Sequence, residues 1–283
     1  MAGVGFRPYM TIVTSRGCPY KCVYCHQTMG KVFRCRSAES VLAELQELHF
    51  KHGFKEFEIV DDCFNLDRER IKAILTGIRD RLAGVKLHFP NALRADILAP
   101  EDMQLFKQAG TVSTVFAIET ASPRLQKLIR KNLNIEKASL AINASVQAGI
   151  YTTGYFMVGF PSETYDEASA TVNFAVSSPL HRAVFFYVVP FAGTELSKMA
   201  ADKIRSKKIK IDSKNMLYYL SKLNISEMSD AELHIVIRRA YQRFYLNPGR
   251  IFKILISHPN LFNLPRDILM TLVKALRKNY SKT

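Results

Sequence analysis

A chain of 283 residues with 48% hydrophobic residues can bury a large core, and its length fits one barrel-like domain or one domain with an extension. It has no run near the roughly 18 apolar residues that cross a bilayer and begins without a signal-peptide pattern, so we expect a cytoplasmic protein with reduced cysteines. The net charge of +15 is uneven, because residues 201–283 hold 17 Lys and Arg against 6 Asp and Glu, a net +11. Such a basic end suits nucleic acid, an anionic membrane surface or an acidic partner domain, or is a solvated helical surface with no partner.

Short β-rich runs and amphipathic runs alternate along the first 190 residues. The predicted strands are 9–14, 56–60, 85–91, 112–118, 151–158 and 183–189. The predicted helices are 37–53, 67–83, 100–109, one or two between 122 and 148, and 163–176. Six β-α units in a row predict an α/β fold, a partial (β/α)6 TIM-type barrel of parallel strands with helices outside. The apolar run Val184–Val189 is typical of a strand covered on both faces.

Beyond about residue 195 the strand signals stop, which predicts a helical C-terminal extension. A capping box at Ser229–Glu232 opens a helix that Pro248–Gly249 is expected to end, and helical runs follow at 250–257 and 265–279. We therefore divide the chain into a core barrel, 1–200, and a basic helical extension, 201–283. The aromatic residues Tyr241, Phe244 and Tyr245 fall at helical spacing, so we expect core contacts from them.

Three of the five cysteines, Cys18, Cys22 and Cys25, lie within eight residues after the first strand. This C-x-x-x-C-x-x-C spacing can hold one face of an iron–sulfur cube, and because a cubane normally takes four cysteines, one iron stays open to an exogenous group. An open metal position is typical of a catalytic site. A structural zinc loop with His26 as fourth ligand, or a two-thiol redox motif of Cys22 and Cys25, would use the same residues.

The segment Arg16–His26 resembles the cysteine loop of radical S-adenosylmethionine (radical SAM) enzymes, which holds a 4Fe–4S cluster. The resemblance implies that S-adenosylmethionine binds the open iron and that Tyr24 takes the aromatic position before the last cysteine. It also implies that Asp62, which stands where the family has a Gly-Gly-Glu-type motif, meets the methionine amino group. Paired Asp residues after a strand, Asp61 and Asp62, could equally cap the following helix.

Further segments resemble the same family in the same order. Glu119 and Thr120 match its Glu-Ser/Thr segment, whose acid binds ribose hydroxyls, and Lys131 matches a basic segment that meets the methionine carboxylate. The end of the fifth strand, with Met157, Val158 and Gly159, matches the adenine-binding strand, although Ser162 replaces the usual glycine of the next turn. Pro190–Leu196 resembles the closing segment.

The pattern looks most like the cobalamin-dependent branch of the superfamily, over about residues 9–250. That branch implies reductive cleavage of S-adenosylmethionine to a 5′-deoxyadenosyl radical, followed by methyl transfer or cyclisation. Because few residues precede the first strand, either the cobalamin domain is in trans, as in a fragment or split protein, or the chain works without cobalamin. The implied partners are a small-molecule or lipid-like substrate, an electron donor such as flavodoxin or ferredoxin, and a cobalamin-binding domain. An anionic surface of the inner membrane is a further expected partner, and nucleic acid is not. The alternatives are a methylthiotransferase-like enzyme acting on tRNA or protein, and a non-catalytic iron–sulfur or zinc module.

Overall fold

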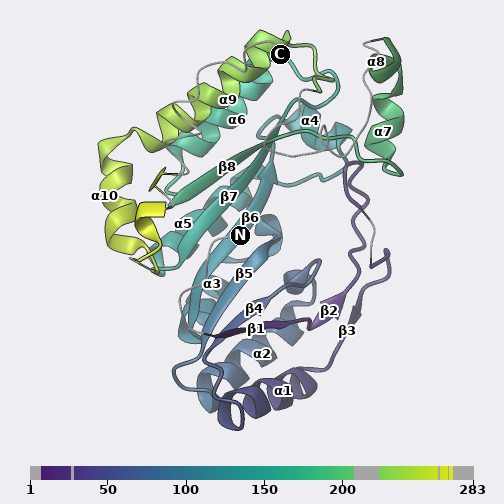
Figure 1. Cartoon of the computed structure of the whole chain (residues 1–283). Coiled ribbons are helices and arrows are strands. Elements are labelled where there is room, and N and C mark those ends of the chain that lie inside the picture. Colours follow the sequence, from purple (N-terminus) through teal and green to yellow (C-terminus); the bar gives the residue numbers. More distant parts are fainter. Residues whose placement is uncertain (1–7, 27–28, 207–222, 261, 267, 270–283) are drawn as a thin grey trace.

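The computed structural model describes residues 8–26, 29–206, 223–260, 262–266 and 268–269. Six strands form one sheet in the order β1-β4-β5-β6-β7-β8, and every neighbouring pair is parallel. These strands are β1 (Tyr9–Ile12), β4 (Glu56–Ile59), β5 (Lys86–Leu93), β6 (Thr111–Glu119), β7 (Tyr151–Val158) and β8 (Arg182–Tyr187). The sheet curves like part of a barrel wall with helices along its outer face (Figure 1). The predicted partial (β/α)6 barrel is confirmed.

The helices that connect the strands lie close to their predicted ranges. They are α1 (Ala38–Phe50), α2 (Arg68–Arg81), α3 (Pro100–Gln108), α4 (Pro123–Leu128), α5 (Ile135–Gln147) and α6 (Tyr165–Ser177). A side-chain oxygen accepts from a first-turn N–H in five of these helices, as Ser37 does for α1 and Thr164 for α6, whereas α3 follows Ala99 and begins with Pro100.

The two faces of the sheet differ in polarity. Outward-facing aromatic residues such as Phe57, Phe89 and Phe116 are buried under the helices and form the main core. On the inner face Glu58, His88 and Ser113 form one register row across three strands, and His88 Nδ1 lies 2.8 Å from Ser113 Oγ. The inner face therefore carries a row of polar side chains across these three strands.

The first strand is shorter than predicted. It ends at Ile12, and the chain then leaves the sheet to form a two-stranded antiparallel ribbon, β2 (Ser15–Arg16) with β3 (Arg34–Cys35). The strand ends there because the backbone N–H of Thr14 donates to the Asp61 carboxylate and not to a carbonyl of the neighbouring strand. This ribbon carries the cysteine loop.

After β8 the chain is helical, as predicted, with α7 (Glu195–Met199), α8 (Ala201–Ser206), α9 (Asp230–Tyr245) and α10 (Pro248–Ser257). The capping box at Ser229 is present. Helix α9 ends at Tyr245, shortly before the predicted end at Pro248–Gly249. Pro248 is also the first residue of α10, with Asn247 as its cap, because proline at a first helical position loses no hydrogen bond. Most of the predicted helix 265–279 lies outside the described residues.

Helix α9 covers the outer edge of the sheet. The Tyr241 hydroxyl bonds both the N–H and the carbonyl of Phe185, at 3.2 and 3.3 Å, and the Tyr245 hydroxyl does the same for Ala183, at 3.1 and 2.8 Å. Two phenols thus satisfy backbone groups of the edge strand β8, which would otherwise be free to pair with another chain. Tyr241 and Phe244 are buried, so the expected core contacts are confirmed. The boundary at residue 200 stays a prediction.

No helix in the described part of the chain has the length and apolarity to cross a membrane.

Candidate active site

The cysteine loop follows β2 and is closed by contacts near its two ends. Gly17 has φ of +82°, and a Cβ there would lie 2.2 Å from the Val32 carbonyl oxygen, so only glycine fits this crossing. The Cys18 N–H donates to the Gly30 carbonyl at 3.2 Å. The middle of the loop is fixed by Val23, whose N–H donates to Ile129 and whose carbonyl accepts from Leu196. The loop therefore bridges the end of α4 and the start of α7.

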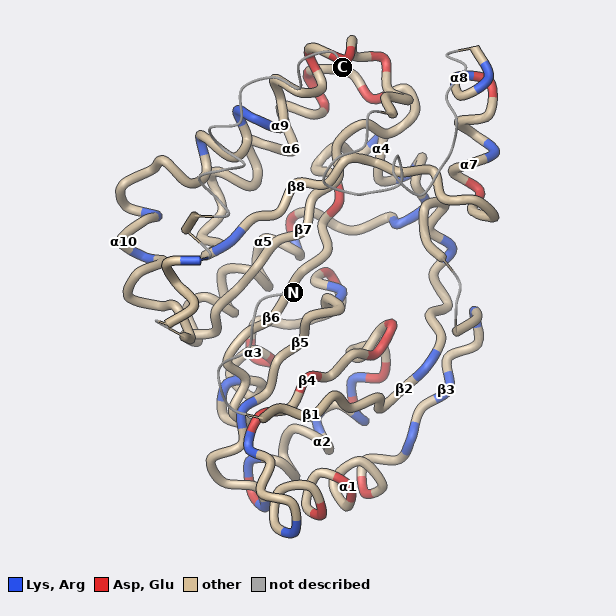
Figure 2. Tube along the Cα trace, in the orientation of Figure 1, with Lys and Arg blue, Asp and Glu red and all other residues tan. Residues whose placement is uncertain are grey.

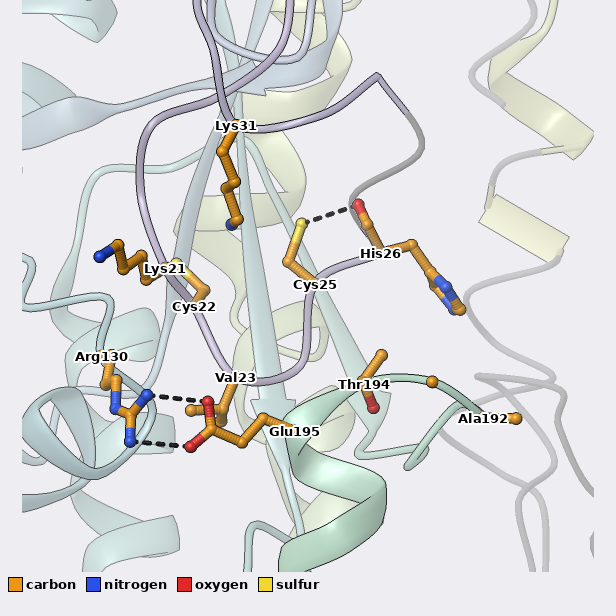
Figure 3. A pocket seen from close by; sticks show the side chains of 11 residues that line it. Lys21, Cys22, Val23, Cys25, His26, Lys31, Arg130, Ala192, Thr194 and Glu195 are labelled. Carbon is orange, nitrogen blue, oxygen red and sulfur yellow. Dashed lines mark hydrogen bonds and ion pairs between the residues drawn. The ribbon is translucent and has the colours of Figure 1, made fainter.

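All five cysteines are free thiols, and Cys22 and Cys25 line a cavity of about 490 Å³ (Figure 3). Cys18 and Cys22 are half-buried and Cys25 is exposed. A turn joins the last two, because the Cys25 N–H donates to the Cys22 carbonyl at 3.2 Å. Burial raises the pKa of both the Cys22 and the Cys25 thiols.

The structure brings a further cysteine, Cys63, to the loop. It follows β4, is 4% exposed and forms a side-chain hydrogen bond with Cys18. That bond is the main reason that the pKa of Cys18 is lowered to about 6, and the same bond raises the pKa of Cys63. The signal in the sequence was its place beside Asp62 at a strand end, where functional groups gather.

Positive charge surrounds the loop. Lys21, His26, Lys31 and Arg130 line the cavity, and the Lys31 amine donates to the Tyr20 carbonyl. Arg16 and Arg34 stand directly opposite each other on the β2–β3 ribbon, and both are exposed. Figure 2 shows segments coloured for Lys and Arg on this ribbon. Opposed like charges destabilise a strand pair unless an anion offsets them.

These residues fit a cluster with three thiolate ligands. Three free thiols on one loop can surround a group with several irons, and the neighbouring cations would offset its negative charge. Among the described residues, no three His, Cys, Asp or Glu side chains converge on the site of a single metal ion. The ring of His26 packs on Phe191, 4.7 Å between centroids, and points away from the Cys25 sulfur in Figure 3.

The two adjacent acids after β4 have different surroundings. Asp61 is 2% exposed, and its carboxylate accepts from the Thr14 N–H at 2.6 Å and from the hydroxyls of Thr14 and Ser15, each at 2.5 Å. Asp62 is exposed and accepts from the Gly17 N–H at 2.9 Å. Asp61 therefore holds the start of the loop, whereas Asp62 stays accessible beside it. The predicted ligand contact of Asp62 remains a prediction.

Glu119, at the end of β6, joins three parts of the site. Its Oε1 accepts from the Tyr24 hydroxyl at 3.1 Å and from the Lys131 amine at 3.0 Å. Burial raises the pKa of Tyr24 well above its usual value, so the phenol stays a neutral donor. Both bonds use Oε1, so neither donor occupies the second oxygen, Oε2.

The backbone around this acid is strained. Glu119 has φ of +67°, and Arg130 and Asn132, on either side of Lys131, have φ of +53° and +50°. Such conformations cost a non-glycine residue roughly 1–3 kcal/mol each and cluster at functional sites. Glu119 and Lys131 are only 7% and 8% exposed, so the fold holds a buried ion pair in a costly geometry.

Three other residues that were predicted to contact S-adenosylmethionine, Thr120, Met157 and Val158, are buried. The Thr120 hydroxyl lies 3.1 Å from that of Thr171 and accepts from the Ser122 N–H, so it supports the start of α4. Val158 belongs to the main core, and Met157 packs in a smaller apolar cluster with Val23 of the cysteine loop. The contacts predicted for these residues, and for Gly159, stay predictions.

A turn after β7 contains a buried acid that was not predicted. Gly159 has φ of +105°, and its N–H and that of Phe160 donate to Glu163 Oε2 at 2.5 and 2.9 Å. Ser162, where the family has glycine, adopts φ of +59°. Glu163 is fully buried, its Oε1 has no hydrogen-bond partner, and burial raises its pKa to about 8 despite the two N–H donors.

Three comparisons with known proteins agree with this arrangement. The family model described as the radical SAM superfamily matches residues 12–175, which include every predicted ligand residue. A Pyrococcus horikoshii protein described as an uncharacterized methyltransferase is 30% identical over 253 residues, 89% of this chain and 54% of that protein. The anaerobic magnesium-protoporphyrin IX monomethyl ester cyclase of Rubrivivax gelatinosus is 25% identical over 268 residues, 94% of this chain and 46% of that enzyme.

Among solved structures, the cobalamin-dependent S-adenosylmethionine radical enzyme OxsB, with aqua-cobalamin and S-adenosylmethionine bound, matches with a TM-score of 0.66. The sequences are 15% identical, over 94% of this chain and 46% of that chain, so the likeness concerns the fold. The chain spans about half the length of these relatives.

Replacing Asp61 by Ala should lower the free energy of unfolding by about 3 kcal/mol or more, because three donors near the loop lose their acceptor. Asp62→Ala is the matched control, and we expect a loss below about 1 kcal/mol because Asp62 is exposed. Urea unfolding of the two variants measures both values. Equal losses would contradict the division of roles between the two acids.

The stability of the protein should depend on Glu163 above pH 5. The folded state keeps the proton up to a pKa of about 8, whereas the unfolded chain releases it near the ordinary value of 4.5. The contribution of Glu163 is therefore fully present at low pH and is lost as the pH rises through this window. Between about pH 5 and about pH 9, the melting temperature should fall more for the wild type than for Glu163→Gln. If the melting temperatures of the two proteins fell equally over this pH range, Glu163 would not titrate in it.

Proposed function

Because the chain belongs to the radical SAM superfamily, we propose that it is the core of an enzyme that cleaves S-adenosylmethionine reductively at a 4Fe–4S cluster held by Cys18, Cys22 and Cys25. When bound, the reduced cluster supplies one electron, which breaks a carbon–sulfur bond to give methionine and a 5′-deoxyadenosyl radical that takes a hydrogen atom from the substrate. The single observation that carries the proposal is the hydrogen bond from Tyr24, in the cysteine loop, to Glu119 at the strand end. This bond connects the loop that carries the three cysteines to the carboxylate that we propose binds the ribose hydroxyls.

The residues of the chain have separate tasks in this scheme. Glu119 binds the ribose hydroxyls through Oε2, and Tyr24 and Lys131 fix its orientation. Asp62, at the surface beside Gly17, binds the methionine amino group. Lys131 partly neutralises Glu119 and lies near the carboxylate end of the ligand, with Thr120, Met157, Val158 and Gly159 on the adenosine side.

We infer that the reaction after hydrogen abstraction is methyl transfer or cyclisation on a small or lipid-like molecule. Curated relatives with these two activities in their names support this inference. We assign cobalamin binding to a separate domain, in another chain or in another part of a longer protein; the assignment is supported by the cobalamin-bound OxsB structure, of which this chain covers 46%. We propose that the electron comes from a carrier such as flavodoxin or ferredoxin and that the enzyme acts in the cytoplasm, where thiols stay reduced.

Anaerobic reconstitution should load about four irons and four sulfides per chain if the three thiolates ligate one cubane. Ala at Cys18, Cys22 or Cys25 should abolish this loading, and Cys35→Ala, an exposed cysteine on β3, should keep it. Iron and sulfide analysis with electron paramagnetic resonance measures the outcome. Stoichiometric zinc without a cluster would contradict the proposal.

Glu119→Gln should keep the cluster and weaken binding of S-adenosylmethionine about tenfold to a hundredfold, because hydrogen bonds to a charged group are worth roughly 1.5–3 kcal/mol. Glu136→Gln, which removes an exposed carboxylate from the first turn of α5, is the control for charge alone and should bind as the wild type does. Calorimetry on the reconstituted proteins measures both affinities. Wild-type affinity in Glu119→Gln would remove this residue from the ligand site.

A further inference from the structure

Helix α10 presents apolar side chains to solvent along one face. Ile251, Phe252, Leu255 and Ile256 are 42%, 65%, 40% and 68% exposed, and their spacing places them on one side of the helix. Beyond the helix, Phe262 is 83% exposed. Eight of the 14 large hydrophobic side chains exposed in the described part of the chain lie between Leu246 and Leu269. A concentration of this kind marks an interaction surface.

The opposite face of α10 fixes the helix to the protein through its cations. The Arg250 guanidinium donates to the carbonyls of Leu180, Val176 and Ser178, the last two at 2.7 and 2.9 Å, and lies 3.9 Å from the centre of the Phe244 ring. The Lys253 amine donates to the Pro179 carbonyl at 2.7 Å. This arrangement is the reverse of an ordinary surface helix, which buries its apolar face and exposes its charges. The outward apolar face is therefore a defined feature of the fold.

The surroundings of this face are positively charged. From residue 233 to the end, the sequence holds ten Lys and Arg and one acid, Asp267. Arg239 donates to the Tyr165 hydroxyl at 3.0 Å and Arg243 to Asn173 Oδ1 at 2.7 Å, both neutral groups. Within the residues that the structure describes, no ion pair joins a cation of α9 or α10 to a carboxylate. The blue segments of α9 and α10 in Figure 2 lie on the same side of the molecule.

We propose that α10 binds the surface of an anionic membrane, with its apolar face among the acyl chains near the headgroups and the arginines of α9 toward lipid phosphates. Aliphatic and aromatic side chains flanked by cations are the combination that such a surface takes up. A second copy of the chain would oppose two cationic surfaces, and nucleic acid would leave the apolar face uncovered. The proposal does not depend on the proposed reaction.

The position of α10 leaves the candidate active site free. Its anchoring carbonyls lie just before β8, at the start of a strand, whereas the cysteine loop lies where the strands end (Figure 1). Substitutions on α10 therefore change the surface without touching the ligand residues.

The test uses the full chain in co-sedimentation with vesicles of phosphatidylglycerol and phosphatidylcholine, and with vesicles of phosphatidylcholine alone. The wild type should bind the anionic vesicles and largely ignore the neutral ones. The double variant Phe252→Ser, Ile256→Ser should lose about tenfold or more in partitioning, because two apolar side chains no longer leave water. Arg239→Gln and Arg243→Gln should each lose about fivefold. Phe50→Ser is the matched control, because Phe50 is 67% exposed at the end of α1, and it should bind as the wild type does.

Thermal unfolding and iron loading should be unchanged in the α10 variants, which separates loss of membrane binding from loss of the fold or of the proposed enzyme. Equal binding to neutral vesicles, or unchanged binding by the double variant, would overturn the proposal. So would a wild-type dimer that the double variant dissociates, since the face would then belong to a second copy. The proposal would also be overturned if RNA displaced the vesicles from the protein and bound the double variant as tightly as the wild type.

Discussion

The arrangement of the site depends on one buried carboxylate, Glu119, at the end of β6. Its Oε1 accepts from Tyr24 in the cysteine loop and from Lys131 beyond α4, so one oxygen joins segments that are about a hundred residues apart at their widest. Hydrogen bonds to a charged acceptor are stronger than those to a neutral one, and loss of Lys131 would leave the buried Glu119 carboxylate without a compensating charge. The left-handed backbone of Glu119 shows that this position is held against local preference.

Much of the fold could be predicted because its signals are local. Helical and strand periodicity and the capping box at Ser229 depend only on nearby residues, and parallel order follows from the alternation itself. An error occurred where a distant contact decides. β1 ends early because Asp61, in another unit, takes the Thr14 N–H.

The candidate site could be anticipated for a topological reason. The ends of parallel strands meet at one edge, so Asp62, Glu119 and the cysteine loop had to be neighbours once the strands were correct. Cys63 and Glu163 were missed as interacting groups, because their importance comes from partners rather than from residue type. The bond of Cys63 to Cys18 spans two β-α units, and Glu163 becomes a neutral acid only because the turn after β7 buries it.

The same topology separates the two surfaces of the molecule. Helices α9 and α10 contact β8 and the segment before it, where side-chain hydroxyls and cations bind backbone groups that the sheet leaves unpaired. That end carries the cations of α9 and α10 and the outward apolar face, whereas the strained backbone of Glu119 and the residues beside Lys131 lie at or beyond the other end of the strands. A parallel sheet has two chemically different ends, since every strand starts at one and finishes at the other. A partner can therefore bind tightly to α10 without moving the cysteine loop. In the same way, backbone strain at the predicted ligand residues does not alter the apolar face of α10.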